Sequence, residues 1–581
     1  MPPFQSRSTS ASRIARISSA GVIEEVPSDS DRALRSSALT PAELMKAILQ
    51  APVDLLWNGG IGTYVKAAEE RHAEVGDKPS DPVRVDADEL RCRVVGEGGN
   101  LGFTQRGRIA YALRGGRIIM DAIDNSAGVD CSDHEVNIKI LLDAVVADGA
   151  LSAEQRNAVL GEMQGDVAAL VLRDNYEQAQ AVSRSATLAA SMVEVHERYI
   201  RALEQMGTLK RELEFLPSDE VLAERKAAGG GLTTPEFAIL LSYTKIALSE
   251  QLIASDLPED PYLSAELERY FPAILRERYP EHIRRHPLRR EIIVSRVVND
   301  LVNRAGTTFA FRLGDETGAA AADVARAYAA AREAFDLPRL WAEIESLDGR
   351  VPAETQIAML LRSRVLLERS TRWLLRNRRR PLDIAATIAR FTPGAAAVSE
   401  ALPTLLPVDT GEVAKLTAEG VPAVLAAQIA QIEELVPTLD IVEIADSVGL
   451  DPVSTAQAYF ALGERLELHW LREQIVALPR ETRWDAMARS ALRDDVYAEQ
   501  AALTADVLGV GSNGLSPTER VAAWLAHNEV AVDRCLTVVA DLRSAGPLDV
   551  ARLSGAVREV RNLINAAGAP AGATQDAQVV R

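Results

Sequence analysis

The sequence has 581 residues, more than one hydrophobic core usually supports, so roughly two to four domains are expected. Its 83 acidic residues outnumber its 64 basic residues, and the net charge of −19 disfavours nucleic acids and anionic membrane surfaces as partners. No apolar run reaches the roughly 18 residues of a membrane span. The 3 cysteines include no C-x-x-C pair, which fits a reducing, cytoplasmic location.

The first part of the chain separates into a tail and a helix. Residues 1–38 are rich in Ser and Arg and lack apolar periodicity, so we expect a disordered tail. A helix is then predicted to begin at Thr40, because Pro41 suits the first helical position and Glu43 completes a capping box.

Short apolar runs bounded by polar or glycine residues follow, with a helical stretch between the last two. This alternation is typical of parallel strands that are buried on both faces. We therefore predict an α/β domain over residues 39–145. The predicted strands and helix are, in chain order, Val53–Trp57, Cys92–Val95, the helix Gln105–Leu113, and Ile118–Ala122.

Beyond about residue 132 helical periodicity dominates. Capping boxes at Ser152 and Ser516 each predict the start of a helix. The segment Phe391–Val413 contains prolines and clustered alanines and is interpreted as a linker. We therefore expect a helical domain over residues 146–400 and a C-terminal helical lobe over residues 401–581, so the fold class is α/β plus all-α.

A glycine-rich segment, Gly96–Gly102, lies between a predicted strand and a helix. A phosphate-binding turn belongs at this place, because glycines let a ligand approach the backbone and a helix N-terminus favours negative charge. Asp121 follows at a distance suited to binding a ribose. The spacing G-x-G-x-x-x-G is one residue longer than the standard fingerprint, so a tight turn without a ligand remains an alternative.

The segment from Ser132 to Glu135 fits a capping box at the start of a helix, with Ser132 as the cap. It also contains three possible metal ligands, Asp133, His134 and Glu135. Neighbouring residues on a helix point in different directions, so we predict no metal site here.

Two stretches resemble the very large bacterial NAD-specific glutamate dehydrogenases. The first is Val53–Tyr64, which reads VDLLWNGGIGTY, and the second runs from Val94 to Ile138. The helical remainder of the chain also resembles these enzymes, for example at Val171–Tyr176 and Leu232–Leu241. The likeness covers roughly residues 39 to 565.

The same residues also resemble ordinary glutamate dehydrogenases. The segment Glu97–Asn100 stands where those enzymes have E-G-A-N, and Asn125–Val129 stands where they have N-A-G-G-V. Ser132 and Glu135 then match the serine and glutamate that follow in that family. The resemblance implies that the two asparagines lie at the nicotinamide–ribose end of NAD and that Ser132 binds the side-chain carboxylate of the substrate.

The site residues implied by the resemblance differ from the spacing argument in one respect. The spacing suggests that the glycine turn holds the pyrophosphate of NAD. The resemblance instead places Gly98 and Asn100 at the nicotinamide half. We prefer the resemblance because it matches many positions without gaps. The predicted cofactor-binding residues are Gly59, Gly60, Gly98, Asn100 and Asn125.

The resemblance also marks what this sequence lacks. The catalytic lysine, the acid–base aspartate and the first glycine fingerprint of the family belong upstream of the segments matched here, and Lys66 belongs to the later segment. We therefore assign no catalytic and no metal-binding residue. We expect the second half of a Rossmann-like parallel sheet followed by a large helical region, and we expect the chain alone to be inactive.

The function implied is that of part of a glutamate dehydrogenase. Such an enzyme uses NAD to convert L-glutamate to 2-oxoglutarate and ammonium, and we expect a cytoplasmic homo-oligomer with the helical region serving assembly or regulation. The alternative is a non-enzymatic helical module for oligomerisation or regulation that carries a vestigial nucleotide-binding sheet.

Overall fold

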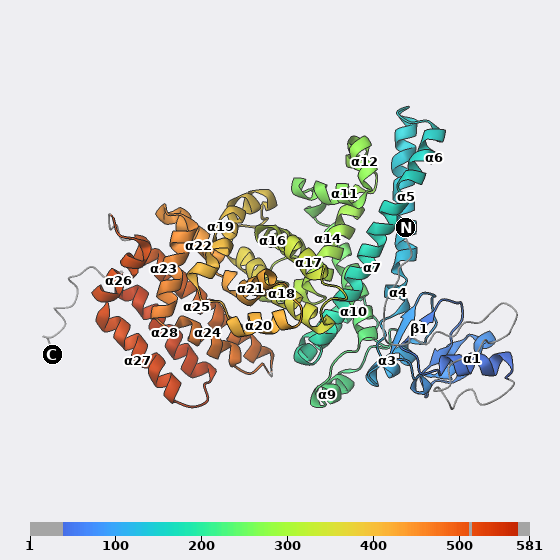
Figure 1. Cartoon of the computed structure of the whole chain (residues 1–581), viewed down its shortest axis with the longest axis horizontal. Helices are drawn as coiled ribbons and strands as arrows, with labels where there is room; N and C mark the ends of the chain where they lie inside the picture. The colour runs from blue at the N-terminus through green and yellow to red at the C-terminus, as the bar shows by residue number, and fades with distance from the viewer. Residues whose placement is uncertain (1–38, 481, 510–513, 568–581) are drawn as a thin grey trace. The chain divides into compact units, whose positions relative to one another are not determined.

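The computed structural model describes residues 39–480, 482–509 and 514–567. The disordered tail predicted for residues 1–38 lies outside the described residues. The chain forms two compact units, Met1–Thr308 and Phe309–Arg581 (Figure 1).

Four short strands form two parallel pairs in the first unit. β1 pairs with β4, with Asn58 opposite Glu97, and β2 pairs with β3. The carboxyl ends of β1 and β4 therefore lie side by side, and the loops that follow them leave from the same edge. The strands are β1 (Leu55–Asn58), β2 (Val65–Lys66), β3 (Val85–Asp86) and β4 (Val94–Glu97).

The third strand predicted over Ile118–Ala122 is wrong. A single parallel bridge, at Arg117, joins this segment to β4, and the chain then enters the short helix α4 (Asp121–Asp124). The carbonyl oxygen of Ile118 accepts a hydrogen bond of 2.6 Å from the Thr234 hydroxyl instead of from a neighbouring strand. Ile118 itself is buried, as its apolar side chain predicts, in the small core between the strands and α3.

Helices make up the remainder of the first unit. The predicted helix Gln105–Leu113 is confirmed as α3, and the capping boxes at Thr40 and Ser152 are confirmed at the starts of α1 and α6. The long helices α5, α7, α10 and α14 pack on one another. The helices are α1 (Pro41–Leu49), α2 (His72–Val75), α3 (Gln105–Leu113), α4 (Asp121–Asp124), α5 (Ser126–Ala147), α6 (Ala153–Glu162), α7 (Gln164–Thr187), α8 (Val193–Gln205), α9 (Asp219–Ala227), α10 (Thr234–Ile253), α11 (Ser264–Tyr270), α12 (Ala273–Arg278), α13 (Pro280–Arg284) and α14 (Arg289–Ala305).

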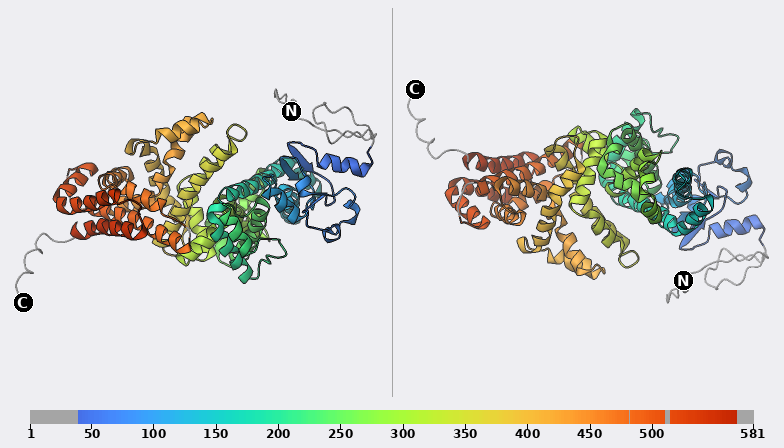
Figure 2. Two further views of the ribbon diagram at one scale, coloured as in Figure 1. Left: turned by 90° about the horizontal axis from the view of Figure 1, so that it is seen from below. Right: turned by 90° about the horizontal axis from the view of Figure 1, so that it is seen from above.

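The described part of the second unit is built from helices, which Figure 2 shows in yellow to red. The capping box at Ser516 is confirmed. The helices are α15 (Phe309–Thr317), α16 (Ala321–Ala334), α17 (Leu337–Glu345), α18 (Ala353–Asn377), α19 (Ile384–Leu405), α20 (Thr410–Ala418), α21 (Ala423–Gln431), α22 (Thr438–Val448), α23 (Pro452–Arg465), α24 (Leu468–Ala477), α25 (Arg483–Gly509), α26 (Pro517–His527), α27 (Glu529–Ser544) and α28 (Val550–Ala567).

The linker predicted over Phe391–Val413 is wrong, because most of it belongs to α19. This helix contains Pro393 and Pro403 in its interior. Its buried side chains, among them Phe391 and Val398, pack against α16, α22 and α23. Burial of this apolar face offsets the local cost of the prolines. In the part of the chain that the structure describes, no helix is both long and apolar enough to cross a membrane.

Candidate functional site

The loops that follow β1 and β4 touch each other. The N–H of Gly99 donates a hydrogen bond of 2.9 Å to the carbonyl oxygen of Asn58. A Cβ atom on Gly99 would lie 2.6 Å from the carbonyl oxygen of Gly60, so a side chain does not fit where the two loops meet. The structure thus brings the predicted residues of the first loop next to those of the second.

The indole of Trp57 lies against the glycines of both loops. A Cβ atom would lie 2.6 Å from the indole at Gly96, 2.6 Å at Gly98 and 3.5 Å at Gly59. The indole therefore needs the glycines at 96 and 98, because a larger residue would displace it. Trp57 keeps 61% of its surface exposed, so this edge of β1 is open to solvent.

The two predicted cofactor-binding asparagines form a direct pair. The side-chain N–H of Asn125 donates to the side-chain oxygen of Asn100 over 2.7 Å, and more weakly to the carbonyl oxygen of Glu97 over 3.4 Å. Asn175 of α7 fixes the turn before α5, because its amide donates to the carbonyl oxygen of Ile123 over 2.7 Å and to the hydroxyl of Ser126 over 3.0 Å. The asparagine pair is therefore held by α7 as well as by the sheet.

A buried ionic cluster lies beneath the glycine-rich segment. Glu97 is fully buried and accepts two hydrogen bonds from Arg108, of 2.7 and 2.9 Å, and Asp121 lies 3.1 Å from the same guanidinium group. Asp124 accepts the backbone N–H of Glu97 over 2.9 Å. Burial raises the pKa of Glu97, and it raises the pKa of Asp124 to about 6. Glu97 and Asp121 thus share one guanidinium group, and Asp124 is hydrogen-bonded to the backbone beside them.

This cluster changes the interpretation of the glycine turn. The N–H groups of Glu97, Gly99 and Leu101 all donate to protein oxygens, the last of them to Asp121 over 2.7 Å. Asp121 is buried and holds the loop, so it does not face a ribose as its spacing predicted. Because these donors are used and the cluster has more acids than bases, the turn is poorly suited to a pyrophosphate.

Ser132 is not a helix cap, and that prediction is wrong. The helix α5 begins at Ser126, so Ser132 lies about two turns inside it, where its hydroxyl is 3.5 Å from the carbonyl oxygen of Gly128. Its side chain is exposed. It lies seven residues after Asn125 and therefore on the same face of the helix.

Sequence reasoning missed two residues of this site. The side-chain amide nitrogen of Asn58 is buried without a hydrogen-bond partner, among the residues described, and it points at Gly102, where a Cβ atom would lie 1.7 Å away. Leu101 has a φ of 59°, which is strained for a residue with a side chain, and it is 66% exposed. Asn58 could have been singled out as the polar residue that ends a strand; the conformation of Leu101 has no signal in the sequence.

Lys66 has a structural role. Its ammonium group forms an ion pair with Asp86 and donates to the carbonyl oxygen of Ala67 over 3.2 Å, and the residue is buried. These contacts join β2 to β3.

His134 is buried beside two carboxylates, which the adjacent-residue argument did not foresee. Asp130, His134 and Asp174 each place a ligand atom within 4.8 Å of the others. The guanidinium group of Arg296 lies 3.6 Å from Asp174. Burial lowers the pKa of His134 to about 4. Because a fixed cation already neutralises part of this group, we assign no metal ion to it.

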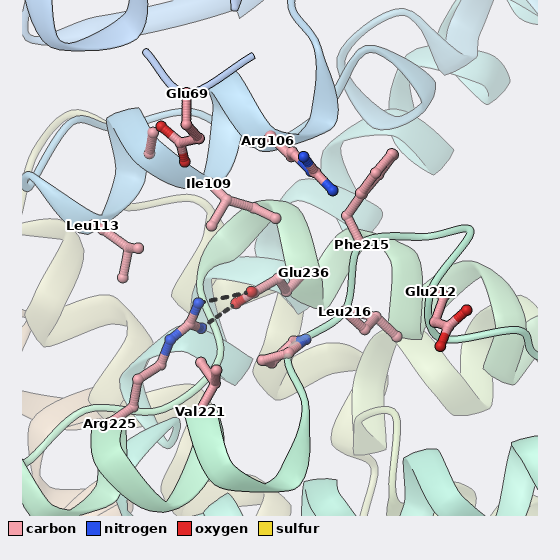
Figure 3. Close-up of a pocket in the computed structure, with 12 residues that line it drawn as sticks. Glu69, Arg106, Ile109, Leu113, Glu212, Phe215, Leu216, Val221, Arg225 and Glu236 are labelled. Carbon is pink, nitrogen blue, oxygen red and sulfur yellow. Dashed lines mark hydrogen bonds and ion pairs between the residues drawn. The ribbon is translucent and has the colours of Figure 1, made fainter. Parts of the chain in front are cut away.

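A pocket of about 600 Å³ lies on another face of α3 (Figure 3). Arg106, Ile109 and Leu113 line it from α3, on the side opposite Arg108. None of the predicted site residues lines this pocket, so it is separate from the asparagine pair. Its other lining residues include Phe215, Val221, and the ion pair between Arg225 and Glu236.

Comparisons with known proteins cover both units. The family described as "Glutamate dehydrogenase, C-terminal" matches residues 229–562, and the family described as "Bacterial NAD-glutamate dehydrogenase, catalytic domain" matches residues 22–185.

Three curated relatives carry the name "NAD-specific glutamate dehydrogenase". The protein of Pseudomonas aeruginosa is 46% identical over 535 residues, and that of Halomonas elongata is 45% identical over 535 residues; each match covers 91% of this chain and 33% of the relative. The protein of Mycobacterium tuberculosis is 42% identical over 538 residues, which is 92% of this chain and 33% of the relative. The chain thus spans about a third of the length of the curated relatives it matches.

Proposed function

Because this chain belongs to the bacterial NAD-specific glutamate dehydrogenase family, we propose that its asparagine pair, Asn100 and Asn125, binds the nicotinamide end of NAD. The observation that carries this proposal is the 2.7 Å hydrogen bond between the two side chains. It uses one N–H of Asn125 and the oxygen of Asn100. Among the described residues the remaining amide nitrogen of Asn100 and the amide oxygen of Asn125 have no protein partner.

The free groups of the pair are complementary to a carboxamide. A carboxamide offers one carbonyl acceptor and two N–H donors, and the pair offers donors from Asn100 and an acceptor from Asn125. The surplus of buried acids beneath the loop opposes a pyrophosphate but not a neutral carboxamide or the cationic nicotinamide ring. We therefore place Gly59, Gly60 and Gly98 around the nicotinamide half of the cofactor.

Ser132 is proposed to bind the side-chain carboxylate of the substrate. It is exposed on the face of α5 that carries Asn125, about 10 Å farther along the helix. A dicarboxylate placed along this face can keep one carboxylate near Ser132 while its α-carbon lies nearer the asparagine pair.

The reaction proposed for the enzyme is the reversible oxidation of L-glutamate. Bound NAD⁺ would supply the acceptor for a hydride from the α-carbon of glutamate; with one water taken up, the products would be 2-oxoglutarate, ammonium, NADH and a proton. The asparagine pair would orient the nicotinamide toward the α-carbon, and Ser132 would orient the substrate. The residues of this chain that we assign bind and position; none of them is assigned the acid–base steps.

The small parallel sheet is proposed to belong to a larger Rossmann-like sheet. The support is the parallel pairing of β1 with β4 and the exposure of Leu55 and Trp57 on β1, since a sheet of two strands is marginal on its own. The helical second unit is proposed to serve assembly into a cytoplasmic homo-oligomer or regulation. The alternative, a non-enzymatic helical module with a vestigial sheet, predicts that NAD does not bind at the asparagine pair.

The test uses the enzyme as the cell makes it. Asn125→Ala should raise the KM for NAD⁺ by about threefold to tenfold, the range of one hydrogen bond, and leave the KM for glutamate nearly unchanged. The matched control is Asn377→Ala, an exposed asparagine of α18 whose side chain donates only to the carbonyl oxygen of Trp373. An unchanged KM for NAD⁺ in the Asn125 variant would refute the proposal.

A further inference from the structure

Arginine side chains from two long helices of the second unit, α18 and α25, approach one another. On α18, Arg369 and Arg376 are two turns apart and share a face, and on α25, Arg489 and Arg493 are one turn apart and share a face. We call these four residues the arginine seam.

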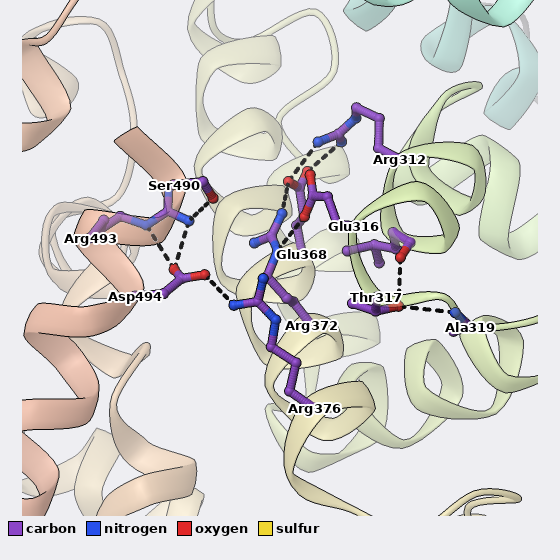
Figure 4. A network of polar contacts seen from close by, with 11 residues as sticks. Arg312, Glu316, Thr317, Ala319, Glu368, Arg372, Arg376, Ser490, Arg493 and Asp494 are labelled. Atoms are coloured by element: carbon purple, nitrogen blue, oxygen red, sulfur yellow. Dashed lines mark hydrogen bonds and ion pairs between the residues drawn. The ribbon is translucent and has the colours of Figure 1, made fainter. Parts of the chain in front are cut away.

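Two contacts bring the faces together. Arg369 donates to the hydroxyl of Tyr497 over 3.4 Å, and Arg376 pairs with Asp494 over 2.6 Å. Arg493 also bonds Asp494, over 2.9 Å, so two guanidinium groups converge on one carboxylate (Figure 4).

The seam carries more positive charge than its partners neutralise. Asp494 is the one carboxylate that forms an ion pair with these arginines, among the residues described. Arg489 donates to the carbonyl oxygen of Val476 over 3.0 Å, and neither it nor Arg369 has a carboxylate partner in the described part of the chain. Glu433 also attracts Arg369, and Arg480 adds a further positive charge beside Arg489, so the seam keeps an excess of positive charge in a protein whose net charge is −19.

Arg372, which also lies on α18, has carboxylate partners. Arg372 lies 2.7 Å from Glu316 and 3.0 Å from Glu368, and Glu368 also pairs with Arg312 over 2.5 Å (Figure 4). Arg364 also lies near Glu368, so three arginines face two glutamates here. The share of glutamates is therefore higher in this cluster than in the arginine seam.

Three of the four seam arginines are at least half-buried, so their charges are partly shielded from water. Arg493 is 9% exposed, and Arg369 and Arg489 are half-buried. Burial and the neighbouring guanidinium groups lower the pKa of Arg489 to about 10, and burial also lowers the pKa of Arg369. Cations that are held together with little counter-charge gain from an anion that replaces the lost water.

We propose that the arginine seam binds the phosphoryl group of a small molecule. A guanidinium group presents parallel N–H donors that match the oxygens of a phosphate, and one phosphoryl group can accept bonds from several such forks at once. A dianionic or trianionic ligand also neutralises more of the excess positive charge than a single carboxylate does. This site is in the second unit and does not depend on the function proposed for the asparagine pair.

The test measures binding of inorganic pyrophosphate and phosphate to the purified chain by isothermal titration calorimetry, at fixed ionic strength in chloride. We expect about one pyrophosphate per chain. Arg489→Gln and Arg369→Gln should each weaken it by roughly tenfold to hundredfold, the effect of losing a hydrogen bond between charged groups. Arg369→Lys should also weaken binding, because it keeps the charge but loses the fork.

The matched control is Arg534→Gln, which removes an exposed arginine paired with Glu559 between α27 and α28. It should leave pyrophosphate binding unchanged. Far-ultraviolet circular dichroism establishes that each variant is folded before titration. The proposal is overturned if the folded parent chain does not bind pyrophosphate, if the control weakens binding as much as the seam variants do, or if succinate binds as tightly as pyrophosphate.

Discussion

The side-chain amide of Asn125 donates a hydrogen bond of 2.7 Å to the side-chain oxygen of Asn100, across 25 residues of sequence. Asn100 lies in the loop after β4, and Asn125 lies immediately before α5. The contact therefore joins the edge of the sheet to the start of the helix that carries Ser132. It fixes the orientation of both amides and leaves the amide nitrogen of Asn100 and the amide oxygen of Asn125 without a protein partner among the described residues.

Ser132→Ala separates substrate binding from helix stability. Because Ser132 lies inside α5 and not at its end, the thermal midpoint should stay within about a degree or two, as expected for a substitution by a better helix former. In the enzyme as the cell makes it, the KM for glutamate should rise by roughly tenfold to hundredfold. Ser152→Ala is the control. It removes the cap of α6, so it should lower the free energy of unfolding by about 0.5–2 kcal/mol and leave the KM for glutamate unchanged. A Ser132 variant with a normal KM would remove the substrate role.

Arg108→Met tests the buried cluster beneath the loop. It leaves Glu97 and Asp121 without their guanidinium partner, beside the buried Asp124, so the free energy of unfolding should fall by about 3–5 kcal/mol in urea titrations. Arg93→Met breaks an exposed pair with Asp54 and should change the free energy by about 0.5 kcal/mol or less. Equal effects of the two substitutions would mean that the cluster does not stabilise the fold.

Asp124 should make stability depend on pH. Burial raises its folded pKa from 3.8 to about 6, so between these values the folded protein binds the proton that the unfolded chain has released. The contribution of Asp124 is therefore present at pH 4 and is lost as the pH rises through about 6. Asp124→Asn should unfold at a higher temperature than the parent at pH 7.5, by an amount equivalent to about 1–2 kcal/mol, and at nearly the same temperature at pH 4. A gap that grows toward low pH would contradict this assignment.

Gly99→Ala tests the contact between the two loops. The new methyl group would lie 2.6 Å from the carbonyl oxygen of Gly60, so the loops must separate, at a cost of about 1–3 kcal/mol, and NAD should bind more weakly. Gly161→Ala is the control, because its methyl group would meet nothing within 4 Å, and alanine in a helix gains up to about 1 kcal/mol over glycine. If Gly99→Ala is as stable as the parent and binds NAD equally well, the loops are not held in register by this glycine.

Several predictions from sequence that depend on neighbouring residues were confirmed. The capping boxes at Thr40, Ser152 and Ser516 are present, because a cap and its partner are three residues apart and need nothing else. The helix Gln105–Leu113 was confirmed for the same reason, since its cap Thr104 directly precedes it.

The errors arose where a distant residue decides the local structure. The same serine–glutamate pattern at Ser132 lies inside a helix, because Asn175, 49 residues beyond Ser126, holds an earlier start for α5. The third strand is absent because Thr234 of α10 takes the carbonyl of Ile118, 116 residues away. The family resemblance singled out Asn100 and Asn125 from the sequence. The hydrogen bond between them, the buried side-chain amide of Asn58 and the buried cluster around Arg108 are visible only in the three-dimensional structure.

The most direct test of the nicotinamide assignment is saturation-transfer difference NMR of NAD⁺ with the purified chain. We expect stronger transfer from the protein to the nicotinamide protons than to the adenine protons. The nicotinamide signal should be lost in Asn125→Ala and unchanged in Asn377→Ala. Transfer that favours adenine, or a nicotinamide signal that survives in the Asn125 variant, would contradict this assignment.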